Sequence, residues 1–198
     1  MQKPRVAILI SGRGSNMEAL IKAAQAADFP AHIALVLANK PDAAGLEIAR
    51  ELGVEAIAVD ARPFGKDKQA HEQAIDALLT SHDIQLVCLA GYMRLLTPWL
   101  VRRWAGRMLN IHPSLLPKFP GLDTHARALA AGETEHGCTV HLVTEGMDEG
   151  PIIGQARVPV LPQDDEATLA ARVLVQEHLL YPKLLAKIAQ NLSAKKEP

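Results

Sequence analysis

Short apolar runs alternate with segments of helical periodicity along the first half of the chain. Residues 5–10 form an apolar run rich in β-branched side chains, a glycine turn follows, and a helical pattern covers 17–27. Apolar runs without polar alternation are typical of strands buried on both faces of a parallel sheet. Strands that alternate with helices give an α/β fold with right-handed crossovers. The same rhythm predicts further strands over 32–38, 54–59 and 84–90, and helices over 42–52 and 67–81.

The second half of the chain is less regular. Three prolines between residues 113 and 121 exclude a helix or a central strand, so that stretch is expected to be a rigid loop. The pattern predicts a Rossmann-like three-layer sandwich, mostly parallel with an antiparallel strand in the C-terminal half, in one domain over 1–198. Its remaining elements are short helices over 97–104 and 123–131, a strand over 108–112, a hairpin-like pair over 138–143 and 151–160, a helix over 166–190 that Pro182 could bend, and a frayed tail over 191–198.

The composition limits the class of protein but does not indicate a reaction. The 198 residues carry a formal charge of −1, are 48% hydrophobic and include two cysteines. The balanced charge disfavours nucleic acid as a partner, and the apolar runs are too short for a membrane span. With no leader pattern and no disulfide framework, the expected location is the cytoplasm. Cys88 lies inside an apolar run and is interpreted as inert core.

A glycine loop, SGRGSN at 11–16, separates the first strand from the first helix. Glycines let backbone N–H groups approach an anion, and the start of a helix adds a favourable dipole, so a bound phosphate is expected here. A plain strand-to-helix turn remains the alternative. The loop lacks the Gly-Lys-Ser/Thr of a P-loop, Met17 replaces the third glycine of a dinucleotide fingerprint, and Asn39 stands where a ribose-binding acid is wanted. A small phosphorylated metabolite is therefore favoured over NAD.

Asn110 and His112 lie two residues apart at the end of a predicted strand, so both side chains face one side. An amide donor beside an imidazole suits a reaction that builds negative charge on a carbonyl oxygen. Asp148, in a glycine-flanked loop, could approach His112, raise its pKa and favour the imidazolium. Spacing alone leaves open a capping asparagine, a loop histidine and a solvated acid; Glu149 is interpreted as such an acid.

A metal centre is not expected. His136, Cys138 and His141 are close in sequence, but on a strand the first two share a face and the third points away. No Cys-x-x-Cys or His-Glu-x-x-His motif occurs, and without a Gly-x-Ser-x-Gly elbow Ser114 is a poor nucleophile candidate.

Several long motifs together resemble one known family. LNIHPSLLP at 109–117 is similar to the signature of folate-dependent formyltransferases. Four further segments narrow the resemblance to glycinamide ribonucleotide (phosphoribosylglycinamide) formyltransferases, over about residues 5–190: ISGRGSN at 10–16, LAGYMRLL at 89–96, EHGCTVHLV at 135–143 and QEH at 176–178.

The resemblance implies transfer of a formyl group from 10-formyltetrahydrofolate to the amine of 5-phosphoribosylglycinamide, in purine biosynthesis, by direct attack of the amine. Asn110 and protonated His112 would stabilise the oxyanion of the tetrahedral intermediate, with Asp148 assisting. The expected partners are these two small molecules, with no metal, and the protein would be a monomer or homodimer. The implied acceptor-binding residues are Gly14, Ser15, Asn16 and Glu177; the implied donor-binding residues are Met93, Arg94, Leu95, Leu96, Asn110, Thr144, Glu145, Gly146, Met147 and, as the nearest counterpart of an arginine that the family often carries, Lys68.

Three other interpretations remain. A formyltetrahydrofolate hydrolase shares the Asn, His and Asp arrangement but carries a preceding regulatory domain, for which 198 residues leave no room. A methionyl-tRNA formyltransferase shares the proline loop but carries a further tRNA-binding domain, and the near-neutral charge disfavours tRNA. A non-catalytic nucleotide-binding module would keep Gly14, Ser15 and Asn16 without requiring Asn110, His112 and Asp148.

Overall fold

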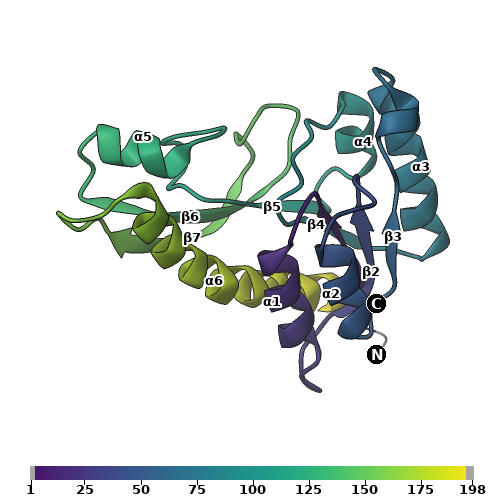
Figure 1. Cartoon of the computed structure of the whole chain (residues 1–198). Helices are drawn as coiled ribbons and strands as arrows, with labels where there is room; N and C mark the ends of the chain where they lie inside the picture. Colours follow the sequence, from purple (N-terminus) through teal and green to yellow (C-terminus); the bar gives the residue numbers. More distant parts are fainter. Residues whose placement is uncertain (1–2, 195–198) are drawn as a thin grey trace.

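A seven-stranded sheet runs through residues 3–194, the part of the chain that the computed structural model describes (Figure 1). The strand order is β3-β2-β1-β4-β5-β6-β7. The strands are β1 (Arg5–Ile10), β2 (His32–Ala38), β3 (Ala56–Ala58), β4 (Leu86–Leu89), β5 (Met108–His112), β6 (Glu135–Leu142) and β7 (Ile152–Pro159). The helices are α1 (Ser15–Ala24), α2 (Gly45–Glu51), α3 (Lys68–Ser81), α4 (Pro98–Arg103), α5 (Thr124–Ala130) and α6 (Glu166–Ala194), with a 3₁₀ turn at Arg62–Phe64.

Strand direction follows the predicted fold. The pairs β1–β2, β1–β4, β2–β3 and β4–β5 are parallel, while β6 is antiparallel to both β5 and β7. The mostly parallel sheet with an antiparallel strand in the C-terminal half is therefore confirmed, and so is the pairing of the last two strands.

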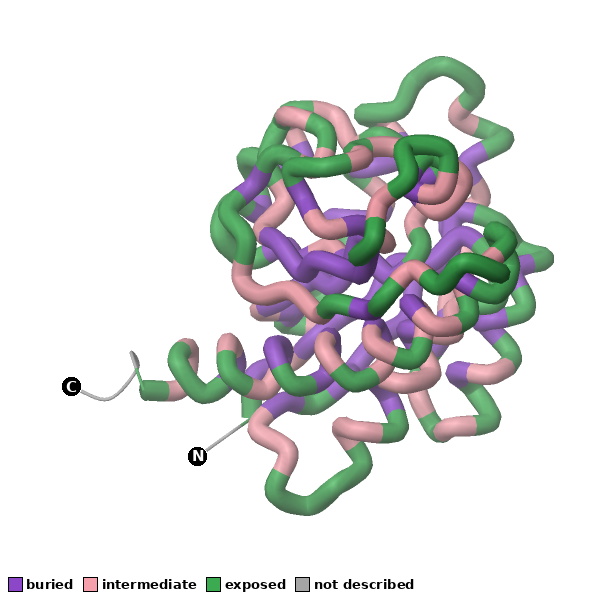
Figure 2. Tube along the Cα trace, turned by 90° about the vertical axis from the view of Figure 1, so that its left-hand side faces the viewer, coloured by how far each residue is buried: buried purple, intermediate pink, exposed green. Residues whose placement is uncertain are grey.

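Alternate side chains of β1 belong to two different hydrophobic cores. Val6, Ile8 and Ile10 belong to a core with residues of α1, α2 and α6, whereas Ala7 and Leu9 belong to one with residues of α3 and α4. Because successive strand residues point to opposite faces, an uninterrupted apolar strand requires helices on both sides. This is the three-layer arrangement of Figure 1, and the buried strands occupy the middle of the trace in Figure 2.

Element ends differ from the predictions by a few residues, and at the tail by more. Helix α1 begins at Ser15 because Gly14, in the left-handed region at φ 70°, forms its N-cap. Strand β6 starts at Glu135, three residues before the predicted start, because it pairs with β7 from that residue onward. Residues 191–194, expected to fray, continue α6, while 195–198 lie outside the described residues. No helix among the described residues is long and apolar enough to cross a membrane.

Ser11 ties together the loops that follow three parallel strands. Its N–H donates to the carbonyl of Gly91 (3.1 Å), its hydroxyl donates to Asn39 Oδ1 (2.6 Å), and that hydroxyl accepts from the N–H of Met93 (2.7 Å). The loops after β1, β2 and β4 are therefore held in fixed relation at the carboxyl edge of the sheet, where open α/β sheets bind ligands.

Candidate active site

Strand β5 presents Asn110 and His112 on the same face of the sheet. Asn110 pairs across the antiparallel ladder with His141, and His112 pairs with Thr139. Residues opposite each other on neighbouring strands share a face, so β6 adds His141 to the side that Asn110 and His112 occupy. The predicted proximity of Asn110 and His112 is thus a consequence of two-residue strand periodicity.

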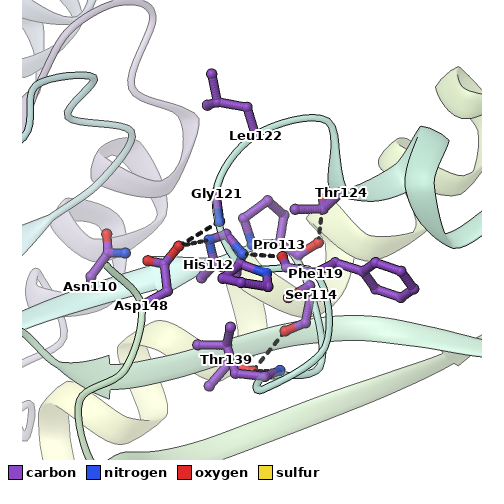
Figure 3. Close-up of polar contacts among 12 residues, drawn as sticks. Asn110, His112, Pro113, Ser114, Phe119, Gly121, Leu122, Thr124, Thr139 and Asp148 are labelled. Atoms are coloured by element: carbon purple, nitrogen blue, oxygen red, sulfur yellow. Dashed lines mark hydrogen bonds and ion pairs between the residues drawn. The ribbon is translucent and has the colours of Figure 1, made fainter. Parts of the chain in front are cut away.

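Both ring nitrogens of His112 face oxygen atoms. Its Nε2 lies 2.9 Å from the carbonyl oxygen of Phe119, which can only accept, so Nε2 is the donor. Its Nδ1 lies 3.4 Å from Asp148 Oδ2, and the same carboxylate oxygen accepts from the N–H of Gly121 (2.9 Å). Figure 3 shows the Asp148 carboxylate between Asn110 and His112, as the sequence predicted for an acid in that loop. A proton on Nδ1 would therefore be shared with Asp148.

His141 also belongs to this cluster, a place that the sequence pattern does not predict. Asn110 Nδ2 lies 3.2 Å from His141 Nε2, and His141 Nδ1 lies 2.9 Å from the carbonyl of Leu142. Asp148 Oδ1 approaches His141 Nε2 to 3.6 Å. Because the Leu142 carbonyl can only accept, Nδ1 of His141 is the donor, so in the neutral ring Nε2 accepts from Asn110 and orients its amide. The signal that could have found His141 is the β5–β6 register, which single-strand periodicity does not give.

His136, Cys138 and His141, considered above as metal ligands, do not lie around a common site. His136 Nε2 lies 3.2 Å from His125 Nδ1, on the side of α5, whereas His141 contacts Asn110. Within residues 3–194 no three His, Cys, Asp or Glu side chains gather as a metal site would require. Ser114 is fully buried and its hydroxyl donates to the carbonyl of Lys118 (2.7 Å), so it closes the proline loop.

The backbone around the site adopts conformations that L-residues seldom take. Phe119, Asp123 and Asp148 all have φ near +55°. Such conformations cost about 1–3 kcal/mol each and persist where surrounding contacts hold them. The proline loop has such contacts, because Arg127 Nη1 donates to the carbonyl of Pro120 (2.6 Å) and Thr124 Oγ1 donates to that of Pro113 (2.7 Å). The Phe119 carbonyl and the Gly121 N–H are thereby aimed at His112 and Asp148.

The pKa of His112 moves in the direction opposite to the prediction. Burial lowers the pKa of His112 below its ordinary value, and the Phe119 carbonyl and the Asp148 charge, which raise it, do not compensate. The predicted effect of Asp148 on this pKa is present, but burial outweighs it, so the neutral imidazole is favoured. Burial also opposes ionisation of Asp148, yet its pKa is lowered overall by contacts with His141 and the Gly121 N–H and by the charge of His112.

A cavity of about 320 Å³ opens beside this cluster. It reaches from Asn110 and His141 to the loop after β4 and to the connection between β6 and β7, which we call the lid (residues 144–150). The lid is tethered from outside, because Arg102 Nε and Nη2 donate to the two carboxylate oxygens of Glu145 (2.7 and 3.2 Å). The lining residues are Leu89, Tyr92, Arg94, Leu95, Leu96, Val101, Asn110, His141, Val143, Thr144, Glu145, Gly146, Met147 and Asp148.

The start of α1 forms a second polar region. Asn16, in the first turn, donates from Nδ2 to Glu177 Oε2 of α6 (2.6 Å). Burial raises the pKa of Glu177, and the hydrogen bond from Asn16 only partly offsets it. The sequence-predicted residues Asn16 and Glu177, 161 positions apart, are thus in contact.

Comparison with known proteins agrees with this geometry. A family model described as formyl transferase matches residues 4–185. The chain belongs to the formyl transferase family. It is 44% identical to phosphoribosylglycinamide formyltransferase of Escherichia coli (strain K12), over 94% of this chain and 87% of that protein. Crystal structures of phosphoribosylglycinamide formyltransferases superpose closely; that from Brucella melitensis has a TM-score of 0.91 and 56% identity, covering 95% of this chain and 96% of the other.

Some relatives of this formyl transferase are much longer. The trifunctional purine biosynthetic protein adenosine-3 of Drosophila pseudoobscura pseudoobscura is 48% identical over 96% of this chain, which spans 14% of that relative. The resemblance seen in the sequence motifs is confirmed at the level of the family and of its fold.

Two of the implied donor-binding residues, Lys68 and Met93, do not line the cavity of this formyl transferase, and neither does the implied catalytic residue His112. Lys68 is exposed at the first position of α3, and the side chain of Met93 is 69% exposed. The other implied donor-binding residues, Arg94, Leu95, Leu96, Asn110, Thr144, Glu145, Gly146 and Met147, all lie on the cavity wall.

Proposed function

We propose that this chain transfers a formyl group from 10-formyltetrahydrofolate to the amine of 5-phosphoribosylglycinamide. The observation that carries the proposal is the convergence of Asn110, His112 and Asp148: Asn110 and Asp148 line the cavity, and His112 lies against Asp148. Formyl transferases generally use a formyl-folate donor, and the phosphorylated acceptor agrees with the names of the E. coli and B. melitensis relatives.

The walls of the cavity suit the flat, partly polar ring system of such a donor. Leu89, Leu96, Val101 and Val143 supply apolar surface, and the polar groups of the site converge at one end with Asn110. A volume of about 320 Å³ fits a ring system with its attached formyl group and leaves the rest of the donor outside. The donor supplies a formyl carbon bonded to a nitrogen that can leave.

Asn110 stabilises the charge that develops on the formyl oxygen. When the acceptor amine adds to the formyl carbon, the carbonyl π pair moves to oxygen, and a fixed amide N–H beside that oxygen lowers the barrier. One N–H of Asn110 is directed at His141, which fixes the amide plane and leaves the other N–H for the oxyanion.

His112 and Asp148 move the proton that completes the transfer. The attacking amine becomes an ammonium and the leaving nitrogen of the donor must gain one proton, so one proton passes between them overall. Neutral His112 has a free lone pair on Nδ1, beside a carboxylate that is ionised. A developing oxyanion adds a second negative charge nearby, which raises the proton affinity of His112 at the moment that it is needed.

The direct test is an assay with both small molecules. Purified protein, mixed with 10-formyltetrahydrofolate and 5-phosphoribosylglycinamide, should release tetrahydrofolate and formylate the acceptor in equal amounts. Omission of the acceptor should abolish release. Release without acceptor would instead indicate a hydrolase, and absence of release under all conditions would contradict the proposal.

A further inference from the structure

The backbone of the glycine loop is fixed from one side by α2. The N–H of Gly45 donates to the carbonyl of Gly12 (3.1 Å). A β-carbon at Gly45 would approach the carbonyl oxygen of Arg13 to 2.8 Å, so only glycine lets α2 come this close. The carbonyls of residues 12 and 13 therefore face α2. The loop is open at Gly12, since a β-carbon there would meet no atom within 4 Å.

Arg13 is a cation that the fold leaves uncommitted at this open loop. Its side chain is 71% exposed, and Nη2 comes no nearer than 3.9 Å to Glu18 Oε2. Glu18 is instead hydrogen-bonded by Lys22 (2.7 Å), one turn further along α1. A charge pair at 3.9 Å on an exposed surface contributes little to stability, so the fold does not explain why an arginine stands between Gly12 and Gly14.

The start of α1 supplies unused polar groups beside Arg13. Gly14 is the N-cap and no side chain caps the helix. Among the hydrogen bonds of the described residues none uses the N–H groups of Ser15, Asn16 or Met17. Asn16 is only 9% exposed, yet its Oδ1 is buried without a partner. A ligand whose anionic group accepts from these N–H groups, and which also donates an N–H or O–H to Asn16 Oδ1, would give hydrogen-bond partners to all of them.

We infer that Arg13 binds the phosphate group of the acceptor and sets the preference of the protein for a phosphorylated acceptor. The inference rests on the proposed function. A guanidinium offers several N–H donors in a planar fork that matches two phosphate oxygens, which an uncharged side chain cannot do. Helix N–H groups orient the phosphate, and Arg13 supplies the full positive charge that they lack. Glu18 competes with the phosphate for Arg13.

The test is the acceptor dependence of Arg13→Gln, with Lys22→Gln as the matched control. Both changes remove a positive charge near Glu18, but Lys22 lies in the last turn of α1, away from the glycine loop. In Arg13→Gln the KM for 5-phosphoribosylglycinamide should rise about tenfold, with kcat and the donor KM within twofold of wild type. Lys22→Gln releases Glu18 but keeps Arg13, so its KM for the acceptor should stay within about twofold of wild type. Calorimetric titration of the acceptor should show the same tenfold weakening without turnover.

Two further comparisons separate phosphate binding from a structural effect. The slow turnover of the unphosphorylated ribosylglycinamide should be equal in wild type and Arg13→Gln, and Glu18→Gln should tighten binding of the phosphorylated acceptor. Equal losses with both acceptors, or an Arg13→Gln variant indistinguishable from Lys22→Gln, would overturn the inference. Failure of the wild type to transfer formyl groups contradicts the proposed function instead, and the calorimetric comparison still decides the role of Arg13.

Discussion

His112 shows two opposing electrostatic effects on one side chain. Its burial favours the neutral ring, while the Phe119 carbonyl and the Asp148 carboxylate favour the charged one, and burial dominates. A histidine poised in this way changes its protonation when one further negative charge appears next to it. Formation of an oxyanion beside Asn110 is such an event, so the neutral resting form is compatible with proton transfer during the reaction.

Replacing Asp148 with asparagine should lower the pKa of His112 further. The carboxylate raises that pKa in the wild type, so its removal leaves burial less opposed. Histidine resonances followed by NMR against pH should show His112 titrating below the ordinary histidine range in the wild type and lower still in Asp148→Asn. His112→Asn assigns the resonance, and an unchanged or higher pKa in Asp148→Asn would show that the carboxylate does not act on the ring.

The sequence predicts the individual residues of the site better than their partners. Asn110 and His112 are found because strand periodicity fixes which side chains share a face. His141 and the N–H of Gly121 are not, because one depends on the register between β5 and β6 and the other on the path of the proline loop. The pKa direction of His112 is missed for a related reason: sequence shows the nearby acid but not the degree of burial.

At the scale of elements, the lid depends on a close backbone approach where it rejoins β7. A β-carbon at Gly150 would lie 1.7 Å from the carbonyl oxygen of Leu142, the last residue of β6. No side chain fits at that distance, so the chain must move if the residue is changed. Asp148 is two positions away and already has a strained φ, so its carboxylate moves with the chain.

Gly150→Ala should therefore destabilise the protein by about 2 kcal/mol or more and lower kcat at least tenfold. Gly12→Ala is the matched control for stability, because a β-carbon there has open space around it. Urea unfolding and steady-state kinetics check the two effects. Equal stability of Gly150→Ala and Gly12→Ala would mean that the backbone approach is not rigid.

Element type is predicted from the sequence more securely than element length. The apolar runs find β1, β2, β4 and β5, whose residues are almost all buried, but Val54 and Val59 fall outside β3, which has only three residues. The apolar pattern indicates which residues are buried, whereas a strand ends at the last residue that pairs with the neighbouring strand. Helix α6 extends four residues beyond the predicted end at residue 190, and Leu192 packs against the core there.

For the molecule as a whole, one buried histidine makes stability depend on pH. His136 is 1% exposed and burial, together with the neighbouring His125, lowers the pKa of His136 to about 4. As the pH falls, the unfolded chain binds a proton at this residue near pH 6.5, whereas the folded chain binds it only near pH 4. Stability contributed by neutral His136 is therefore present above pH 6.5 and is lost as the pH falls towards 4.

The free energy of unfolding should fall between pH 7 and pH 5 by about 2 kcal/mol more in the wild type than in His136→Gln. His82→Gln, a change at the end of α3, should retain the wild-type dependence. Urea titrations at several pH values give the comparison. Parallel pH profiles of wild type and His136→Gln would show that this histidine is not the source.

The central claim is that a formyl group is transferred at Asn110, His112 and Asp148, and kcat of His112→Asn tests it most directly. Asparagine retains a hydrogen-bond donor but cannot accept and return a proton at neutral pH. With both small molecules saturating, kcat should fall about 10²–10⁴-fold while calorimetric binding of the acceptor stays within a few-fold of wild type. A variant that keeps wild-type kcat would contradict the assignment of this cluster as the catalytic centre.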